Sequence, residues 1–131
     1  MIQKSALEHL ADKAAEIENN PIGKYDCTLI AREMKRILQA EGKRAELVRF
    51  GILNRYGEPE CPITPVIFQN KAWLYHDVCC SKDQIYDPLT SAEPISLEQY
   101  SLLVFRTEIS YHTEDELLML YRNAANRPIR M

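Results

Sequence analysis

The stretch AWLYHDVCCSKDQIYD, residues 72–87, decides the fold of this chain. Residues 72–80 are rich in aromatic and β-branched side chains, a composition typical of a β-strand. The polar residues 81–84 predict a turn. Residues 85–87 predict a second strand that Pro88 ends, because proline lacks the N–H that a sheet needs. We therefore expect an antiparallel hairpin in this part of the chain.

The register of the hairpin determines where its chemically active side chains lie. With a turn of even length, Cys80 pairs with Ile85. Asp87 then lies opposite Val78, which shares a face with His76. His76 and Asp87 become diagonal neighbours within reach of a hydrogen bond, whereas a turn of odd length would place them on opposite faces.

Each of these residues also has an ordinary structural interpretation. His76 can be a core histidine whose ring nitrogens are satisfied by neighbours. Asp87 followed by Pro88 is typical of a turn. Asp77 is a second candidate to orient His76, but it belongs to the opposite face of the strand.

Two helices are predicted before the hairpin. Residues 2–18 carry apolar side chains at helical spacing with charges on the other side, and Pro21 cannot continue that helix. A second helix is predicted over residues 27–41, with Asp26 as its N-cap and Gly42 just after its end.

Apolar alternation, glycine and proline content and capping boxes place the remaining elements. They are a strand at 45–50, a loop at 51–62, a short strand at 65–69, a helix at 96–104, an edge strand at 107–111 and a helix at 113–123. Helices flanking a run of strands indicate an α+β fold. The length of 131 residues predicts one domain over 1–131, with an N-terminal helix at 1–18 and a C-terminal strand and helix at 106–131.

Cys27 is predicted at the start of the second helix, on the buried stripe of that helix. A buried free cysteine is most often a small hydrophobic core residue. However, unpaired backbone N–H groups and the positive end of the helix dipole favour a thiolate at this position. Cys27 is therefore a candidate nucleophile, and His76 is its candidate base.

The other histidines and cysteines are assigned no chemistry. His9 is predicted on the charged side of the first helix, and His112 in a turn before a capping box. No C-x-x-C motif occurs, and adjacent strand residues such as Cys79 and Cys80 point to opposite faces, which disfavours a metal site. Together with Cys61, these cysteines are expected to be free thiols.

Charge and hydropathy exclude several classes of partner. The net charge is −3 and basic residues never form a run of five, so we expect no nucleic-acid binding. No stretch of about 18 apolar residues occurs, so we expect no membrane span. The N-terminus is amphipathic rather than a signal-peptide core, which predicts a cytoplasmic protein, or a domain delivered as an effector.

The order of these elements resembles a known superfamily. A cysteine at the start of a buried helix, the segment Trp73-Leu-Tyr-His76-Asp-Val and the segment Ile85-Tyr-Asp87-Pro-Leu-Thr are similar to the papain-like and transglutaminase-like fold. With Leu97-Glu-Gln-Tyr100 on a following helix, the chain looks most like the papain-fold toxin domains of bacterial polymorphic toxin systems. The resemblance covers residues 19–105.

The resemblance implies a cysteine-dependent protease, deamidase or acyl transferase that needs no metal and no cofactor. It implies a triad of Cys27, His76 and Asp87, a protein or peptide substrate, and an immunity protein as a possible partner. Asn20, with Asn19 beside it, is the candidate oxyanion donor, although its spacing from Cys27 departs from the family pattern. Thr28, after the cysteine, is a second departure and leaves the substrate class open.

Two other interpretations remain. The first is a papain-like binding or immunity module without catalysis, in which Cys27 is unreactive. The second is a binding domain of a different fold, in which Cys27 and His76 lie far apart.

Overall fold

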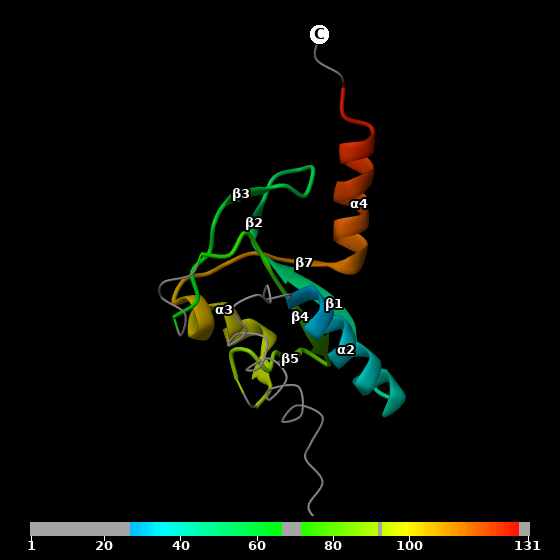
Figure 1. Cartoon of the computed structure of the whole chain (residues 1–131), viewed down its shortest axis with the longest axis vertical. Coiled ribbons are helices and arrows are strands. Elements are labelled where there is room, and N and C mark those ends of the chain that lie inside the picture. Colours follow the sequence, from blue (N-terminus) through cyan, green and yellow to red (C-terminus); the bar gives the residue numbers. More distant parts are fainter. Residues whose placement is uncertain (1–26, 67–71, 92, 129–131) are drawn as a thin grey trace, which may run out of the picture.

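A computed structural model of the chain describes residues 27–66, 72–91 and 93–128. The predicted helix at 2–18 and the N-cap assigned to Asp26 lie outside these residues. The described part is α+β, with three helices and a five-stranded antiparallel sheet in the order β6-β5-β4-β1-β7 (Figure 1). Its strands are β1 Glu46–Phe50, β4 His76–Ser81, β5 Gln84–Tyr86, β6 Ile95–Ser96 and β7 Tyr111–Thr113.

The predicted hairpin is confirmed in its register. Cys80 pairs with Ile85 and Cys79 with Tyr86, as a turn of even length requires. The turn is tighter than predicted, because only Lys82 and Asp83 lie between the strands, with φ of 51° and 61°. Two successive residues in the left-handed region form the type of tight turn that matches the twist of a hairpin.

Strand β4 begins at residue 76 rather than at residue 72. The neighbouring strand β1 ends at Phe50, which pairs with His76, so the preceding residues have no strand partner in register. At Gly51 the chain passes so close to Tyr75 that a Cβ would lie 3.2 Å from the Tyr75 Cβ. Trp73 instead forms an isolated bridge with Ile63.

The predicted loop at 51–62 contains a small second sheet of β2 Ile52–Leu53 and β3 Pro59–Cys61. The Asn54 side chain closes the turn between them by accepting the N–H groups of Tyr56 and Glu58 at 2.8 and 3.0 Å. Gly57 completes the turn with a φ of 80°, which a side chain would strain. The proline and glycine content of residues 51–62 predicted an irregular loop, so this hairpin was missed at the level of sequence.

Two further strand predictions are wrong in their bounds. The predicted strand at 65–69 is not formed at residues 65 and 66, and residues 67–69 lie outside the described part. The predicted edge strand at 107–111 exists as β7, but it begins at Tyr111. His112 therefore lies in that strand rather than in a turn, paired with Arg49.

The helices cover both faces of the sheet. Helix α2 (Cys27–Ala40) packs Met34 and Leu38 against Cys79 on one face. Helix α3 (Leu97–Phe105) lies on the other face, where the main core forms. That core contains Val48, Phe50, Val78, Cys80, Ile85, Tyr100, Val104 and Phe105. Cys79 and Cys80 thus face opposite sides, as predicted.

Helix α4 (Glu114–Ala125) lies beside α2 on the same face of the sheet, because Lys35 of α2 bonds Glu114 at 2.8 and 3.1 Å. Of the two predicted capping boxes, the one at Thr113 is complete and the one at Ser96 forms its N-cap bond. Thr113 forms a complete capping box with Glu116, and the Ser96 side chain accepts the N–H of Gln99. No helix in the described residues has the length and apolar character to cross a bilayer.

Candidate functional site

Cys27 is the first residue of α2 and lies almost buried, with 8% of its surface exposed. It continues the buried stripe of the helix formed by Ile30, Ala31, Met34 and Leu38, as the sequence predicts. Its sulfur accepts the backbone N–H of Asp77 at 3.3 Å. The N-terminal end of α2 therefore lies against the first residues of strand β4.

The Asp77 N–H is available to the sulfur because β5 is shorter than β4. The last pair between these strands joins Cys79 to Tyr86, so no β5 residue lies in register beside Asp77. The helix N-terminus occupies that place at the sheet edge. A tertiary contact thus supplies the sulfur with a backbone donor that no sequence motif reveals.

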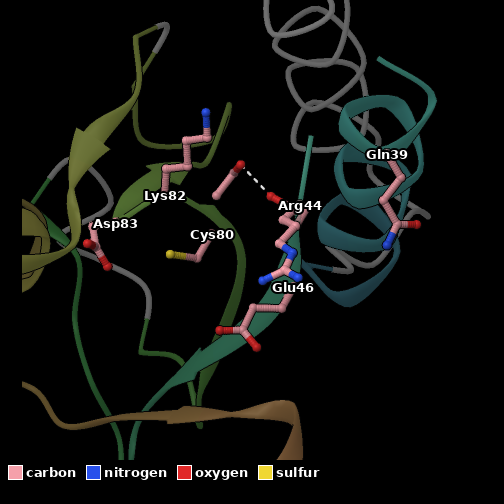
Figure 2. Close-up of a pocket in the computed structure, with 8 residues that line it drawn as sticks. Gln39, Arg44, Glu46, Cys80, Lys82 and Asp83 are labelled. Atoms are coloured by element: carbon pink, nitrogen blue, oxygen red, sulfur yellow. Dashed lines mark hydrogen bonds between the residues drawn. The ribbon is translucent and has the colours of Figure 1, made fainter. Parts of the chain in front are cut away.

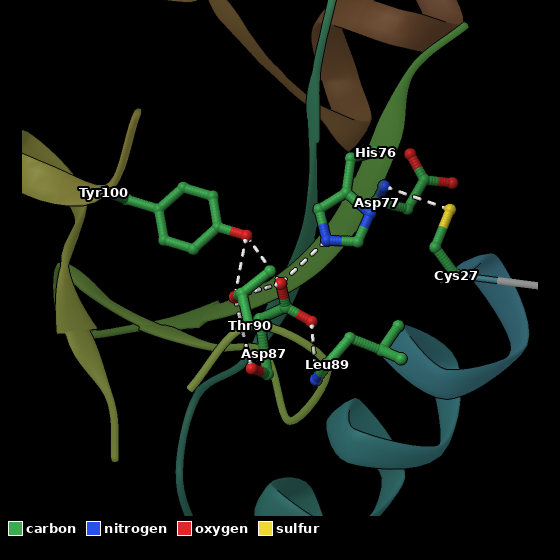
Figure 3. Close-up of polar contacts among 7 residues, drawn as sticks. All are labelled: Cys27, His76, Asp77, Asp87, Leu89, Thr90 and Tyr100. Carbon is green, nitrogen blue, oxygen red and sulfur yellow. Dashed lines mark hydrogen bonds and ion pairs between the residues drawn. The ribbon is translucent and has the colours of Figure 1, made fainter. Parts of the chain in front are cut away.

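His76 lies between Cys27 and Asp87 (Figure 3). Its side chain has no exposed surface, and its Nε2 lies 2.7 Å from Asp87 Oδ2. The other ring nitrogen, Nδ1, faces the Cys27 sulfur. The Trp73 ring stacks on the imidazole at 4.4 Å and 27°, which limits its rotation. The structure therefore brings the three predicted site residues together.

Asp87 is buried and accepts several further hydrogen bonds. Tyr100 donates its hydroxyl at 2.5 Å and Thr90 its hydroxyl at 2.6 Å, both to Oδ2, while the Leu89 N–H reaches Oδ1 at 3.3 Å. Helix α3 contributes Tyr100 to this set from the far side of the core. The carboxylate is thus held in one orientation toward His76.

Thr90 and Tyr100 are site residues to which the sequence assigned no role. Both lie in segments that the family resemblance singled out, Asp87-Pro-Leu-Thr90 and Leu97-Glu-Gln-Tyr100. The available signal was a buried carboxylate on a strand, which needs donors to remain charged. Sequence spacing does not say which hydroxyls supply them.

The electrostatics of the pair favour charge on both partners. Burial alone would lower the pKa of His76, but the Asp87 carboxylate and the neighbouring Cys27 side chain outweigh it and raise that pKa above its ordinary value. Burial would raise the pKa of Asp87, but His76, Thr90 and Tyr100 outweigh it and lower that pKa. The geometry thus stabilises an imidazolium–carboxylate pair.

This pair predicts a pH window for stability. The raised His76 pKa stabilises the fold fully below the ordinary value of 6.5, and this contribution is lost as the pH rises toward the folded-state pKa. The lowered Asp87 pKa stabilises the fold above 3.8, and this is lost as the pH falls through the folded-state pKa. We expect the contribution of the pair to be largest between these two values.

The measurement is urea unfolding from pH 3 to pH 9, comparing Cys27→Ala with Cys27→Ala/His76→Gln. The shared alanine removes the Cys27 side chain from both proteins, so that they differ only at residue 76. The difference in unfolding free energy between them should peak in the window and shrink on both sides. A difference that stays constant over the whole range would contradict charge on the pair.

Asp77 does not compete for His76. Its carboxylate accepts two hydrogen bonds from Arg49, at 2.6 and 3.0 Å, and one from the Thr28 hydroxyl at 2.7 Å. These contacts lie on the α2 face of the sheet, as strand alternation predicts. Thr28, noted as a departure from the papain-like pattern, therefore ties the start of α2 to β4.

The remaining predicted residues fall elsewhere. Asn19, Asn20 and His9 lie outside the described residues. All four cysteines are free thiols, with Cys61 exposed and Cys79 and Cys80 buried. Across residues 27–66, 72–91 and 93–128, no group of three metal-ligating side chains is present.

No family model, curated protein or solved structure matches the chain.

Proposed function

We propose that the chain is a cysteine-dependent enzyme that acts on an amide or acyl bond. Cys27 is the nucleophile, His76 the acid and base, and Asp87 the residue that orients His76. One observation carries the proposal: a fully buried imidazole hydrogen-bonds to a buried carboxylate on one side and faces the Cys27 sulfur on the other.

Each residue has a defined part in the reaction. The Cys27 sulfur forms a bond to the carbonyl carbon, and the bond from that carbon to the leaving group breaks. Protonated His76 gives its proton to the leaving group. Neutral His76 then takes a proton from water or from an incoming amine, which displaces the sulfur and resolves the thioester. Water makes the protein a protease or deamidase, and an amine makes it a transferase.

The arrangement of elements supports a papain-like class for this enzyme. Cys27 at a helix start, His76 on a strand and Asp87 directly after the paired strand follow the chain order of that superfamily. The α3 residue Tyr100, from the Leu-x-x-Tyr segment, bonds the aspartate. We propose a bacterial toxin or effector domain whose substrate is a protein or peptide and whose partner is an immunity protein.

The alternative function is a papain-like binding or immunity module without catalysis. The small exposure of Cys27, 8%, favours this alternative, since core cysteines are buried and inert. Reactivity of the thiol separates the two functions.

We expect iodoacetamide to modify Cys27 at about pH 6 faster than the other three cysteines. An imidazole beside a cysteine activates the sulfur as a nucleophile, and His76 faces Cys27 alone among the four cysteines in the described residues. Burial raises the pKa of Cys79 to about 12 and also raises that of Cys80, so both stay protonated. Mass spectrometry of a labelling time course gives the four rates.

Exposed Cys61 is the internal control, because it is accessible but has no imidazole partner in the described residues. His76→Gln should lower the Cys27 rate to that of Cys61 or below. Labelling of Cys27 no faster than Cys61 in the wild type would favour the inactive module.

A further inference from the structure

A cavity of about 360 Å³ lies between α2, β1 and α4, and two neighbours of the candidate nucleophile line it. Thr28, the residue after Cys27, and Asp77, whose N–H bonds the Cys27 sulfur, both line it. An extended peptide spans about 3.3–3.6 Å per residue. The side chain next to a carbonyl held at Cys27 is therefore in range of this cavity.

The part of the cavity lining that α4 contributes is largely apolar. Leu117 is buried there, while Leu118 and Tyr121 keep 53% and 47% of their surfaces exposed, and Leu47 of β1 also lines the cavity. Large exposed apolar side chains around a hollow are typical of a binding surface. These apolar side chains favour binding of a ligand side chain with an aliphatic stem.

The charges on its wall are unbalanced. Arg49 is paired with Asp77 at 2.6 Å, and Lys35 with Glu114 at 2.8 Å. Arg32 also lines the cavity, one helical turn after Thr28, and it has no ion pair or hydrogen bond within the described part of the chain. Among the residues that the structure describes, Arg32 is thus the one cation of the wall without a partner, and it can attract a carboxylate.

We propose that this cavity is a substrate subsite for an acidic side chain with an aliphatic stem, glutamate in particular, next to the bond that Cys27 attacks. The methylene groups pack on Leu117, Leu118 and Tyr121, and the carboxylate pairs with Arg32. This proposal rests on the proposed function, because it takes Cys27 as the point to which the substrate is joined.

A second cavity, at the other end of the sheet, provides the matched control (Figure 2). It is lined by Arg44, Lys82 and Asp83 among others, near the C-terminal end of α2 and the β4–β5 turn. Arg44 is exposed, as Arg32 is, and the two substitutions Arg32→Glu and Arg44→Glu change the net charge equally. Only the first alters the cavity beside Cys27.

The test uses two affinity labels, N-iodoacetyl-glutamate amide and N-iodoacetyl-glutamine amide, which differ only in charge. The glutamate label should modify Cys27 about three- to fivefold faster than the glutamine label, as an exposed ion pair predicts. Arg32→Glu should abolish or reverse this preference, and Arg44→Glu should retain it. Equal rates for both labels in the wild type, with rapid labelling by iodoacetamide, would overturn the subsite and leave the proposed function standing.

If iodoacetamide itself shows no preference for Cys27, the proposed function fails while the cavity can still be tested. In Cys27→Ala, acetyl-glycyl-glutamate amide should shift the backbone NMR signals of Leu117 and Tyr121 at lower concentration than the glutamine peptide. Identical titrations with the two peptides would overturn the subsite independently of catalysis.

Discussion

Replacing Cys27 by alanine is expected to abolish the biological effect of the protein while leaving it folded. Loss of the nucleophile in a thiol or serine triad lowers turnover by about 10⁴-fold or more. The same change removes one sulfur atom at a helix start, which costs about 1–2 kcal/mol of folding free energy. Growth inhibition on expression in a bacterial host measures the effect, and urea unfolding measures the stability.

His76→Ala serves as the companion variant, because it removes the acid and base but leaves the thiol. It should also abolish the effect, at a greater cost in stability, since it leaves Asp87 buried without its main cation. If Cys27→Ala keeps the full effect while His76→Ala merely unfolds the protein, both residues are packing and the binding module is the better account.

Replacing Asp87 by alanine is expected to give the largest loss of stability in the site, about 3–5 kcal/mol. Four donors converge on this carboxylate, from His76, Leu89, Thr90 and Tyr100. Removing it leaves a buried imidazole and two buried or half-buried hydroxyls without their acceptor. The free energy of unfolding in urea at about pH 6 gives the magnitude.

Asp87→Asn should be milder in both stability and activity than Asp87→Ala, and milder in activity than His76→Ala. An amide keeps a hydrogen-bond acceptor for the hydroxyls, but it removes the charge that stabilises imidazolium and tends to select the wrong tautomer. Asp115→Ala is the control, because Asp115 is exposed in the first turn of α4 and its loss should cost about 0.5 kcal/mol. Equal losses for Asp87→Ala and Asp115→Ala would contradict a structural and orienting role for Asp87.

The hairpin register and the helix ends were predictable because they depend on local chemistry. A polar turn between two apolar strands pairs Cys80 with Ile85, and a capping box begins α4 at Thr113. The small sheet around Asn54 was missed because its turn depends on one side chain that accepts two backbone N–H groups. Composition cannot distinguish such a turn from an irregular loop.

The sequence by itself determined the α+β class, the buried stripe that carries Cys27 and the shared face of His76 and Asp87. Strand alternation and helical periodicity act over a few residues, so they can be read along the chain. The tertiary structure alone decided that α2 places its first residue beside the open end of β4, where the Asp77 N–H meets the Cys27 sulfur. It also decided that α3 brings Tyr100 to Asp87. These contacts join residues 13 and 50 positions apart, and packing of the whole core, rather than any local preference, brings them together.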